Sequence, residues 1–228
     1  MTPFIGTLRR TVTRPEFIRA RPLSTLQGHS HIYTFSHGIS PDTHTLSLLP
    51  TDPPTLHLAI GTTSKLPPTP DSFVENPEFL CILQSFLAKH AHADPDVQSQ
   101  AQVMASTAGA NLVSGGVFRT HHPRQRKPGG ESSSGASGQG GAGSGGRGGF
   151  IHVSDGRNPP EYGRIAWPED IFGSLEVDGH GNIEGNGNYQ PSGTYRIVTR
   201  NGILGLSPFL REKLVQRLRA EEQNLRGK

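Results

Sequence analysis

The N-terminal half of the chain changes from a strand-like to a helix-like pattern of apolar residues. Between residues 43 and 62, leucine and isoleucine alternate with polar or small residues on both sides of the turn PTDPP, which predicts two short strands with one buried face. From 75 to 91 the apolar residues recur at helical spacing. Asn76 is a suitable N-cap and Pro77 suits the first turn, so a helix is expected here.

A second helix is expected after Asp94, because Pro95 follows it and proline is well placed at the first helical position. Cys81, inside the first helix, is interpreted as a small buried apolar residue. Together the strands and helices predict an N-terminal α+β unit over residues 30–118.

The C-terminal part of the chain has the short, interrupted apolar segments of a small antiparallel sheet. Strands are expected at residues 150–155 and 171–178, the second with a bend or bulge at Gly173, where its alternation breaks. Two further strands are joined by Asn201-Gly202, which is a strong hairpin signal. The proline-rich coil between the first two strands carries two aromatic anchors, Tyr162 and Trp167.

The last element expected is an amphipathic helix that closes this sheet. Ser207 is a good N-cap, and Pro208 suits the first helical position. Leucines follow along one helical stripe, with Val215 beside it and mixed charges on the other face. The stripe consists of Leu210, Leu214, Leu218 and Leu225. The predicted fold class is therefore α+β, with a β-meander plus C-terminal helix over residues 150–228.

Residues 119–149 differ from both units. They contain no periodic apolar residue, and eleven glycines lie between 129 and 149. Such a segment cannot bury enough apolar surface to offset the entropy cost of ordering, so a disordered, basic and Gly/Ser-rich linker is expected. Its basic cluster either contacts RNA phosphates or is simply solvated. The cluster consists of Arg119, Arg124, Arg126 and Lys127.

Positive charge is concentrated at the N-terminus. The chain has a formal charge of +3, yet residues 1–23 hold five arginines and one acid, while the remainder holds 17 basic and 18 acidic side chains. Spaced arginines among threonines and apolar residues are typical of a mitochondrial transit peptide, with cleavage between Leu23 and Ser24. The alternative is a basic arm that binds nucleic acid or an acidic surface. No run of about 18 apolar residues occurs, so no membrane span is expected.

The C-terminal helix also carries basic residues that are candidates for rRNA contact. In the alternative interpretation they form a solvated face that is balanced by acids on the same helix, and the sequence leaves both open. The candidates are Arg211, Lys213, Arg217 and Arg219, and the acids are Glu212, Glu221 and Glu222.

The stretch EVDGHGNIEGNGNY, residues 176–189, has the composition of a ligand-binding loop. Counted from Asp178, however, positions that a calcium loop needs are occupied by His180, Ile183 and Tyr189, and the G-x-G-x-x-G spacing of a dinucleotide site fails as well. The stretch is therefore interpreted as turns of a small sheet, with Ile183 returning to the sheet in a short strand.

No catalytic, cofactor or metal site is expected, and no small-molecule ligand. The densest histidine group, within residues 29–44, lies where no regular structure is expected to fix its geometry, and the single cysteine cannot supply a thiolate pair for zinc. Ser174 is a candidate nucleophile, but it lacks the second glycine of a G-x-S-x-G elbow. The acids near Ser174 are interpreted as solvated turn and strand-edge residues: Glu169, Asp170, Glu176 and Asp178.

Two segments of the C-terminal third, PEDIFGSLEVDGHGNI and YRIVTRNGILGLSPFLREKL, carry a family resemblance. They are similar to the C-terminal region of a fungal mitochondrial small-subunit ribosomal protein of the mS46 type, and the resemblance covers about residues 149–220. It implies a mitochondrial matrix protein that docks on ribosomal proteins and small-subunit rRNA without catalysing a reaction.

The expected function is therefore that of a non-catalytic component of the mitochondrial small ribosomal subunit that supports mitochondrial translation. A matrix assembly or translation-activating factor is the first alternative, and a matrix enzyme is the second. Ribosomal proteins are usually strongly basic, because they neutralise phosphates. The near-neutral balance after residue 23 favours a peripheral subunit that contacts mainly other proteins.

Overall fold

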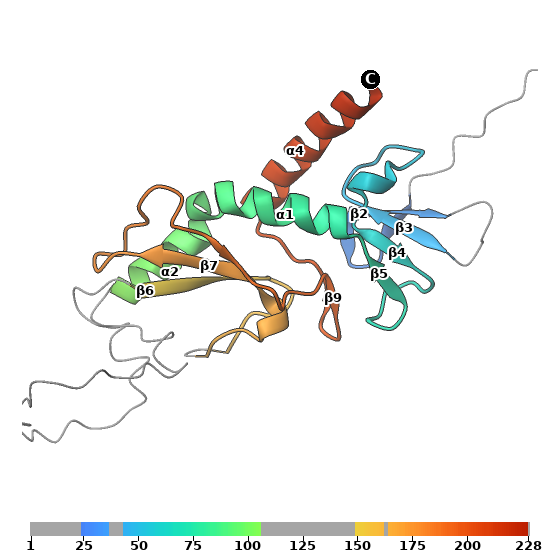
Figure 1. The fold of residues 1–228 in the computed structure, drawn as a ribbon. Coiled ribbons are helices and arrows are strands. Elements are labelled where there is room, and N and C mark those ends of the chain that lie inside the picture. The colour runs from blue at the N-terminus through green and yellow to red at the C-terminus, as the bar shows by residue number, and fades with distance from the viewer. Residues whose placement is uncertain (1–23, 37–42, 106–148, 162–163, 228) are drawn as a thin grey trace, which may run out of the picture.

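The protein is an elongated α+β molecule in which a helix runs between two groups of antiparallel strands (Figure 1). The computed structural model describes residues 24–36, 43–105, 149–161 and 164–227. The predicted fold class is confirmed for this part of the chain. Most of the transit peptide and linker predictions fall on residues outside it.

The N-terminal sheet has five antiparallel strands in sequential order. Its first two strands were not expected from the sequence, and they place the histidines of residues 29–36 in regular structure. The strands are β1 (Ser24–Leu26), β2 (His29–Ser36), β3 (His44–Ser47), β4 (Gly61–Thr63) and β5 (Phe73–Glu75).

The prediction of a strand beginning at Leu56 is wrong. Leu56–Leu58 forms a 3₁₀ turn, η1, and Leu56 is exposed. The side-chain amide of Asn76 donates hydrogen bonds to the carbonyls of Leu56 and Ala59, at 3.0 and 2.7 Å, so these carbonyls are held away from a strand ladder. The same Asn76 accepts a hydrogen bond from Glu78 N and thereby caps the next helix, as predicted.

The helices of this half follow the prediction closely. They are α1 (Pro77–His90) and α2 (Pro95–Ala105), with a 3₁₀ turn, η2 (Ala91–Ala93), between them. The buried face of α1 consists of Phe79, Leu83, Phe86 and Leu87. Cys81 lies two positions from Phe79 and Leu83, on the opposite side of the helix, and is exposed, so the prediction that it is buried is wrong.

The C-terminal sheet has three strands in the order β6-β7-β8, followed by a separate hairpin, β9-β10. The bulge predicted at Gly173 is confirmed, since Val153 pairs with Gly173 but Ser154 pairs with Ile171. The hairpin is also confirmed, but Thr199 pairs with Gly202, so its turn lies one residue earlier than predicted. The elements are β6 (Gly149–Ser154), a 3₁₀ turn η4 (Pro168–Asp170), β7 (Ile171–Val177), β8 (Gln190–Pro191), β9 (Val198–Thr199) and β10 (Gly202–Ile203).

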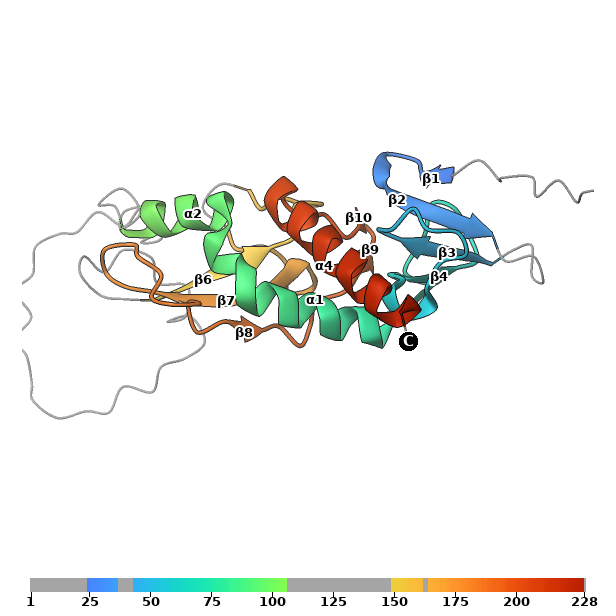
Figure 2. The same cartoon turned by 90° about the horizontal axis from the view of Figure 1, so that it is seen from above.

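The final helix, α4 (Pro208–Arg226), is capped by Ser207 as predicted and runs beside α1 when seen from above (Figure 2). Three of its four predicted stripe leucines are buried, but Leu225 is exposed. The stripe continues instead at Glu222, four residues after Leu218. The buried carboxylate of Glu222 accepts hydrogen bonds from the hydroxyls of Thr51 and Thr55, at 2.9 and 3.1 Å.

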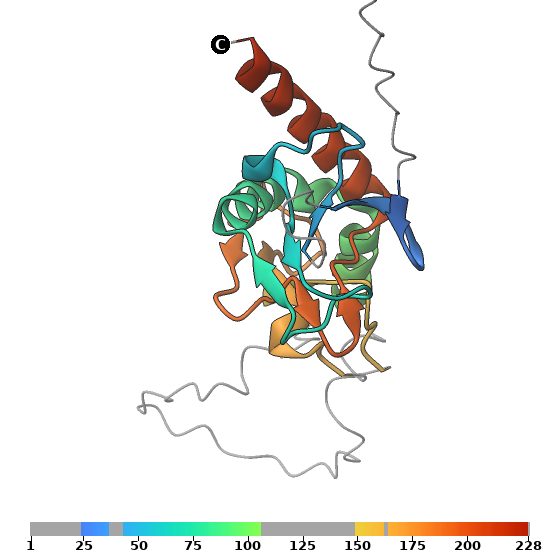
Figure 3. The same ribbon diagram turned by 90° about the vertical axis from the view of Figure 1, so that its right-hand side faces the viewer.

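The two halves of the molecule pack together, a point that the sequence leaves open. One hydrophobic core includes Phe86 of α1, Phe172 of β7 and Leu214 of α4. Hydrogen bonds also cross between the halves: Ser207 Oγ donates to Asp94 Oδ2 at 2.8 Å, for example. Viewed along the long axis, α4 rises from α1 on the side away from the C-terminal strands (Figure 3).

Candidate docking surfaces

Buried charge is concentrated in what we term the Arg157 cluster, which consists of Asp155, Arg157, Asp170 and Tyr195. The Arg157 side chain is only 2% exposed, and the two aspartate side chains are fully buried. Arg157 Nε donates to Asp170 Oδ1 at 2.7 Å and lies 3.7 Å from Asp155 Oδ2. Its terminal nitrogens donate to three backbone carbonyls at 2.7–2.8 Å: those of Glu169, Arg196 and Ile197.

The Asp155 carboxylate likewise has several hydrogen-bond partners within the protein. Its oxygens accept from the backbone N–H groups of Arg157 and Gly205, at 2.9 and 2.8 Å, and from the Tyr195 hydroxyl at 2.9 Å. A Cβ at Gly205 would lie 2.8 Å from Asp155 Oδ1, so only glycine fits there without a shift. The cluster thus joins β6, η4 and the segments on both sides of the β9-β10 hairpin.

Electrostatics support a structural role for this cluster. Burial raises the pKa of Asp155, although Arg157 and the hydrogen bonds act in the opposite direction. Burial and the neighbouring Asp155 charge raise the pKa of Tyr195 well above its ordinary value, so Tyr195 stays protonated and donates. Asp170 is buried, which corrects its interpretation as a solvated turn residue.

The candidate nucleophile Ser174 has a histidine beside it. His152 of β6 pairs with Ser174 of β7, and His152 Nδ1 lies 2.9 Å from Ser174 Oγ. Burial lowers the pKa of His152, so the neutral ring is favoured. Within the described residues no acidic side chain is hydrogen-bonded to His152, which leaves a cross-strand polar pair on the face opposite Ile151 and Val153.

The glycine-rich stretch forms turns, as predicted, and packs against α2. Asp178 Oδ1 accepts from the N–H groups of His180 and Asn182, and the latter bond lowers the pKa of Asp178. Gly181 has φ +82°, and a Cβ there would lie 2.9 Å from the Ala101 carbonyl of α2. Ile183 packs on the core as expected, but it lies in no strand, so that part of the prediction is wrong.

The histidines are dispersed. His29 and His31 both lie in β2 with their rings 5.8 Å apart, which corrects the expectation of irregular structure there. In the described ranges no group of three or more His, Cys, Asp or Glu side chains could hold a metal ion.

The predicted RNA-contact residues divide into two sets. Those of the linker, Arg119, Arg124, Arg126 and Lys127, lie outside the described residues. The second set lies on α4, where Lys213 and Arg219 are exposed and Arg211 and Arg217 are half-buried. The positive charges of Lys213 and Arg217 act on His90, which lies at the end of α1 next to Lys89, and lower its pKa. Lys89 and His90 were not among the predicted RNA-contact residues, and the only sequence signal for them was the basic end of the predicted helix.

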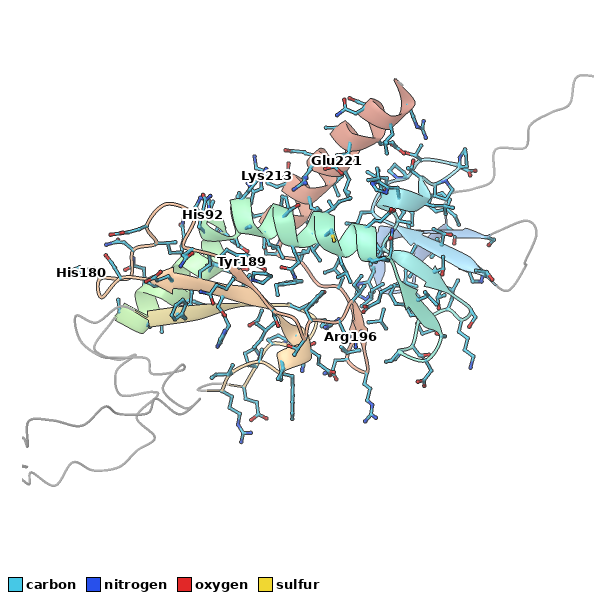
Figure 4. All side chains as sticks on the ribbon, in the orientation of Figure 1. His92, His180, Tyr189, Arg196, Lys213 and Glu221 are labelled. Atoms are coloured by element: carbon cyan, nitrogen blue, oxygen red, sulfur yellow. The ribbon has the colours of Figure 1, made fainter. Side chains whose placement is uncertain are left out.

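A second exposed surface surrounds Trp167 and is named the Trp167 surface. Of the two predicted aromatic anchors, Tyr162 lies outside the described residues, and Trp167 is 67% exposed, with Val74 and Ile165 exposed beside it. Trp167 borders two grooves, one lined by Val74 and the other by Ile165. Three arginines also line these grooves: Arg164, Arg196 and Arg200. Figure 4 shows Arg196 below α1 and Lys213 above it, so the Trp167 surface and the basic residues of α4 lie on different sides of the molecule.

Comparisons with protein-family models, curated proteins and solved structures found no match for this chain. Among the described residues, no helix is long and apolar enough to span a membrane.

Proposed function

We propose that the protein is a non-catalytic component of the mitochondrial small ribosomal subunit and docks there on ribosomal proteins and rRNA. The observation that carries this proposal is the presence of two chemically different surfaces on one hydrophobic core. One is the Trp167 surface, where large apolar side chains are exposed, and the other carries the basic residues of α4. A protein with this arrangement is suited to bridging protein and RNA neighbours.

The Trp167 surface supports a protein contact. Tryptophan and arginine are the residues most enriched at energetic centres of interfaces, where an exposed apolar side chain is buried by the partner. Pro168 directly follows Trp167 and restricts the backbone conformation of Trp167. Such restriction lowers the entropy cost of docking.

The location in the mitochondrial matrix rests on the sequence. Ser24 is the first residue of β1, and its carbonyl accepts a hydrogen bond from Thr34 Oγ1 at 3.2 Å. Cleavage between Leu23 and Ser24 would therefore leave the described sheet intact. The resemblance of residues 149–220 to a small-subunit ribosomal protein supplies the particular assembly.

Sedimentation of the tagged protein through a sucrose gradient of a mitochondrial lysate tests the proposal. We expect it to co-migrate with the small subunit at high salt. We expect Trp167→Ala to reduce that co-migration, whereas Leu225→Ala, which trims an exposed apolar residue elsewhere, leaves it unchanged. Salt-labile migration would indicate the assembly or translation-activating factor instead. Recovery only in the soluble fractions would overturn the ribosomal proposal.

A further inference from the structure

Basic side chains of α1 and α4 lie near each other where the first turns of α4 approach the end of α1. We name this region the α1–α4 basic surface, and it consists of Lys89 and His90 of α1 with Lys213 and Arg217 of α4. The buried leucines of α4 fix its rotation, and Lys213 and Arg217, four residues apart, lie on the same flank. Lys89 and Lys213 are exposed, and His90 and Arg217 are half-buried.

The groups that face His90 are cationic or aromatic. Its ring lies 4.8 Å from the Phe86 ring within α1. Burial lowers the pKa of His90, and the positive charges of Lys213, His92, Arg217 and Lys89 lower it further. Arg217 is paired with Glu221 at 2.9 Å. Among the described residues, Lys89, His90 and Lys213 have no hydrogen bond or ion pair with a carboxylate.

The helix dipole explains only part of this arrangement. Cations at the C-terminus of α1 are favourable, which accounts for Lys89 and His90. Lys213, however, lies in the first half of α4 and Arg217 at its midpoint, where the dipole offers no such stabilisation. Their approach to the end of α1 adds repulsion within a chain that is nearly neutral after residue 23. A polyanion would relieve that repulsion.

We propose that the α1–α4 basic surface binds the phosphate backbone of RNA, with Lys89, Lys213 and Arg217 contacting phosphates. Charge complementarity identifies the occupant, because cations of two helices act on His90 and, among the described residues of this surface, only Arg217 has a carboxylate partner. His90 adds a proton-dependent contact: a nearby phosphate favours the charged imidazolium, so binding takes up a proton from solvent. The identity of the RNA as small-subunit rRNA rests on the proposed function, whereas the phosphate contact does not.

The test is a salt titration of binding between the full-length protein and a labelled RNA duplex, measured by fluorescence anisotropy. Each phosphate that the protein neutralises contributes about 0.7–0.9 to the slope of log K against log salt. We expect the slope of the double variant Lys213→Gln/Arg217→Gln to be smaller by up to about 2. The matched control, Arg164→Gln/Arg200→Gln, removes the same charge from the Trp167 surface and should change the slope little. Equal slopes for the two double variants would overturn the inference.

Measuring RNA binding over a series of pH values adds a second test, because a general loss of positive charge would not change the pH dependence of binding. Binding should tighten as the pH falls from about 7.5 to 5.5, and His90→Gln should remove part of that tightening. Circular dichroism checks folding. If His90→Gln is misfolded, Lys89→Gln, at an exposed position, provides the slope test in its place. A pH dependence that is identical in wild type and folded His90→Gln would refute the role of His90.

The inference and the proposed function can fail separately. If RNA binding depends on Lys213 and Arg217 but the protein is absent from the small subunit, the proposed function is refuted and the RNA-binding surface is supported. If the protein co-migrates with the subunit but the double variant binds RNA unchanged, the RNA-binding surface is refuted and the proposed function is supported.

Discussion

The Arg157 cluster and the α1–α4 basic surface use the same kinds of side chain in opposite ways. In the first, one buried arginine meets two carboxylates and three backbone carbonyls, and each hydrogen bond has a length of 2.7–2.8 Å. In the second, the charges of three cations act on one histidine, and one of these cations, Arg217, is paired with the half-exposed Glu221. The first arrangement is complete within the chain. For the second, we propose that an anion from outside supplies the balancing charge.

This difference determines what each site contributes. Removing one member of a buried ion pair leaves an uncompensated charge, which is strongly destabilising. An exposed pair contributes little to stability, because water and salt screen it. Substitutions in the Arg157 cluster should therefore change the free energy of unfolding, and those in the α1–α4 basic surface should change binding.

The largest effect is expected for Asp170→Ala, which removes the carboxylate bonded to Arg157 Nε. The guanidinium would stay buried with only the more distant Asp155 as counter-charge, so the free energy of unfolding should fall by about 3–5 kcal/mol. Urea unfolding followed by circular dichroism measures the change. Glu169→Ala, at the exposed neighbouring residue, should cost no more than about 0.5 kcal/mol. Similar losses in both variants would contradict the assignment of the cluster.

Tyr195→Phe should have the next largest effect. It removes a hydroxyl that donates to the buried Asp155 carboxylate, and hydrogen bonds to charged groups contribute about 1.5–3 kcal/mol. Tyr189→Phe is the matched control, since its hydroxyl donates to the neutral acceptors Gln84 and Phe172, and a loss of about 0.5–1.5 kcal/mol is expected. A larger loss at Tyr189 would show that charge in the cluster is not the source of the difference.

The cap shared by two helices should contribute less. Asp94 accepts from Asp96 N at the start of α2 and from the Ser207 hydroxyl, which itself caps α4. Ser207→Ala should reduce the free energy of unfolding by about 0.5–2 kcal/mol. A double-mutant cycle with Asp94→Asn should give a coupling energy of at least about 0.5 kcal/mol. Strict additivity would mean that the two caps act independently.

Local signals in the sequence predicted most of the helices and several strands. Caps at Asn76 and Ser207, the bulge at Gly173 and the period of α1 all depend on neighbours in the chain, so the sequence contains them directly. The η1 turn and the burial of Glu222 depend on hydrogen bonds to residues 17 or more positions away. Periodicity alone predicts a strand that begins at Leu56, and it places the last buried residue of α4 at Leu225 instead of Glu222.

The candidate sites show the same limit. The basic residues of α4 could be identified from the sequence, because they lie on one predicted helix. Their approach to His90 could not, since more than 120 positions in the chain separate His90 from Lys213 and Arg217. The Arg157 cluster also escaped prediction, because its partners are spread from residue 155 to 205 and the acid pattern around Asp170 suggested a solvated turn.

A pH effect on folding is expected in the direction opposite to that on RNA binding. Burial lowers the pKa values of His31, His90 and His152 in the folded protein, while the unfolded chain has the ordinary value of about 6.5. As the pH falls through about 6.5 the unfolded state binds more protons, so the free energy of unfolding decreases.

Urea midpoints at pH 7.5 and 5.5 measure this decrease, which should be smaller in the triple variant His31→Gln/His90→Gln/His152→Gln. The protein should thus be less stable at the lower pH while it binds RNA more tightly. A stability that rises on acidification across this range would contradict the role of the buried rings.

The smallest effect on stability is expected for Arg217→Gln, although its effect on binding should be clear. The Arg217–Glu221 pair is a partly exposed i,i+4 pair with the base on the N-terminal side, the less favourable order, so its loss should cost no more than about 0.5 kcal/mol. Arg217 also lowers the pKa of His90, and NMR titration of that ring should therefore show a higher pKa in the variant. Arg219→Gln, at an exposed position on the same helix, serves as the control and should leave the His90 titration unchanged. If Arg217→Gln reduced the free energy of unfolding by several kcal/mol and left the pKa of His90 unchanged, Arg217 would instead have a structural role like that of Arg157.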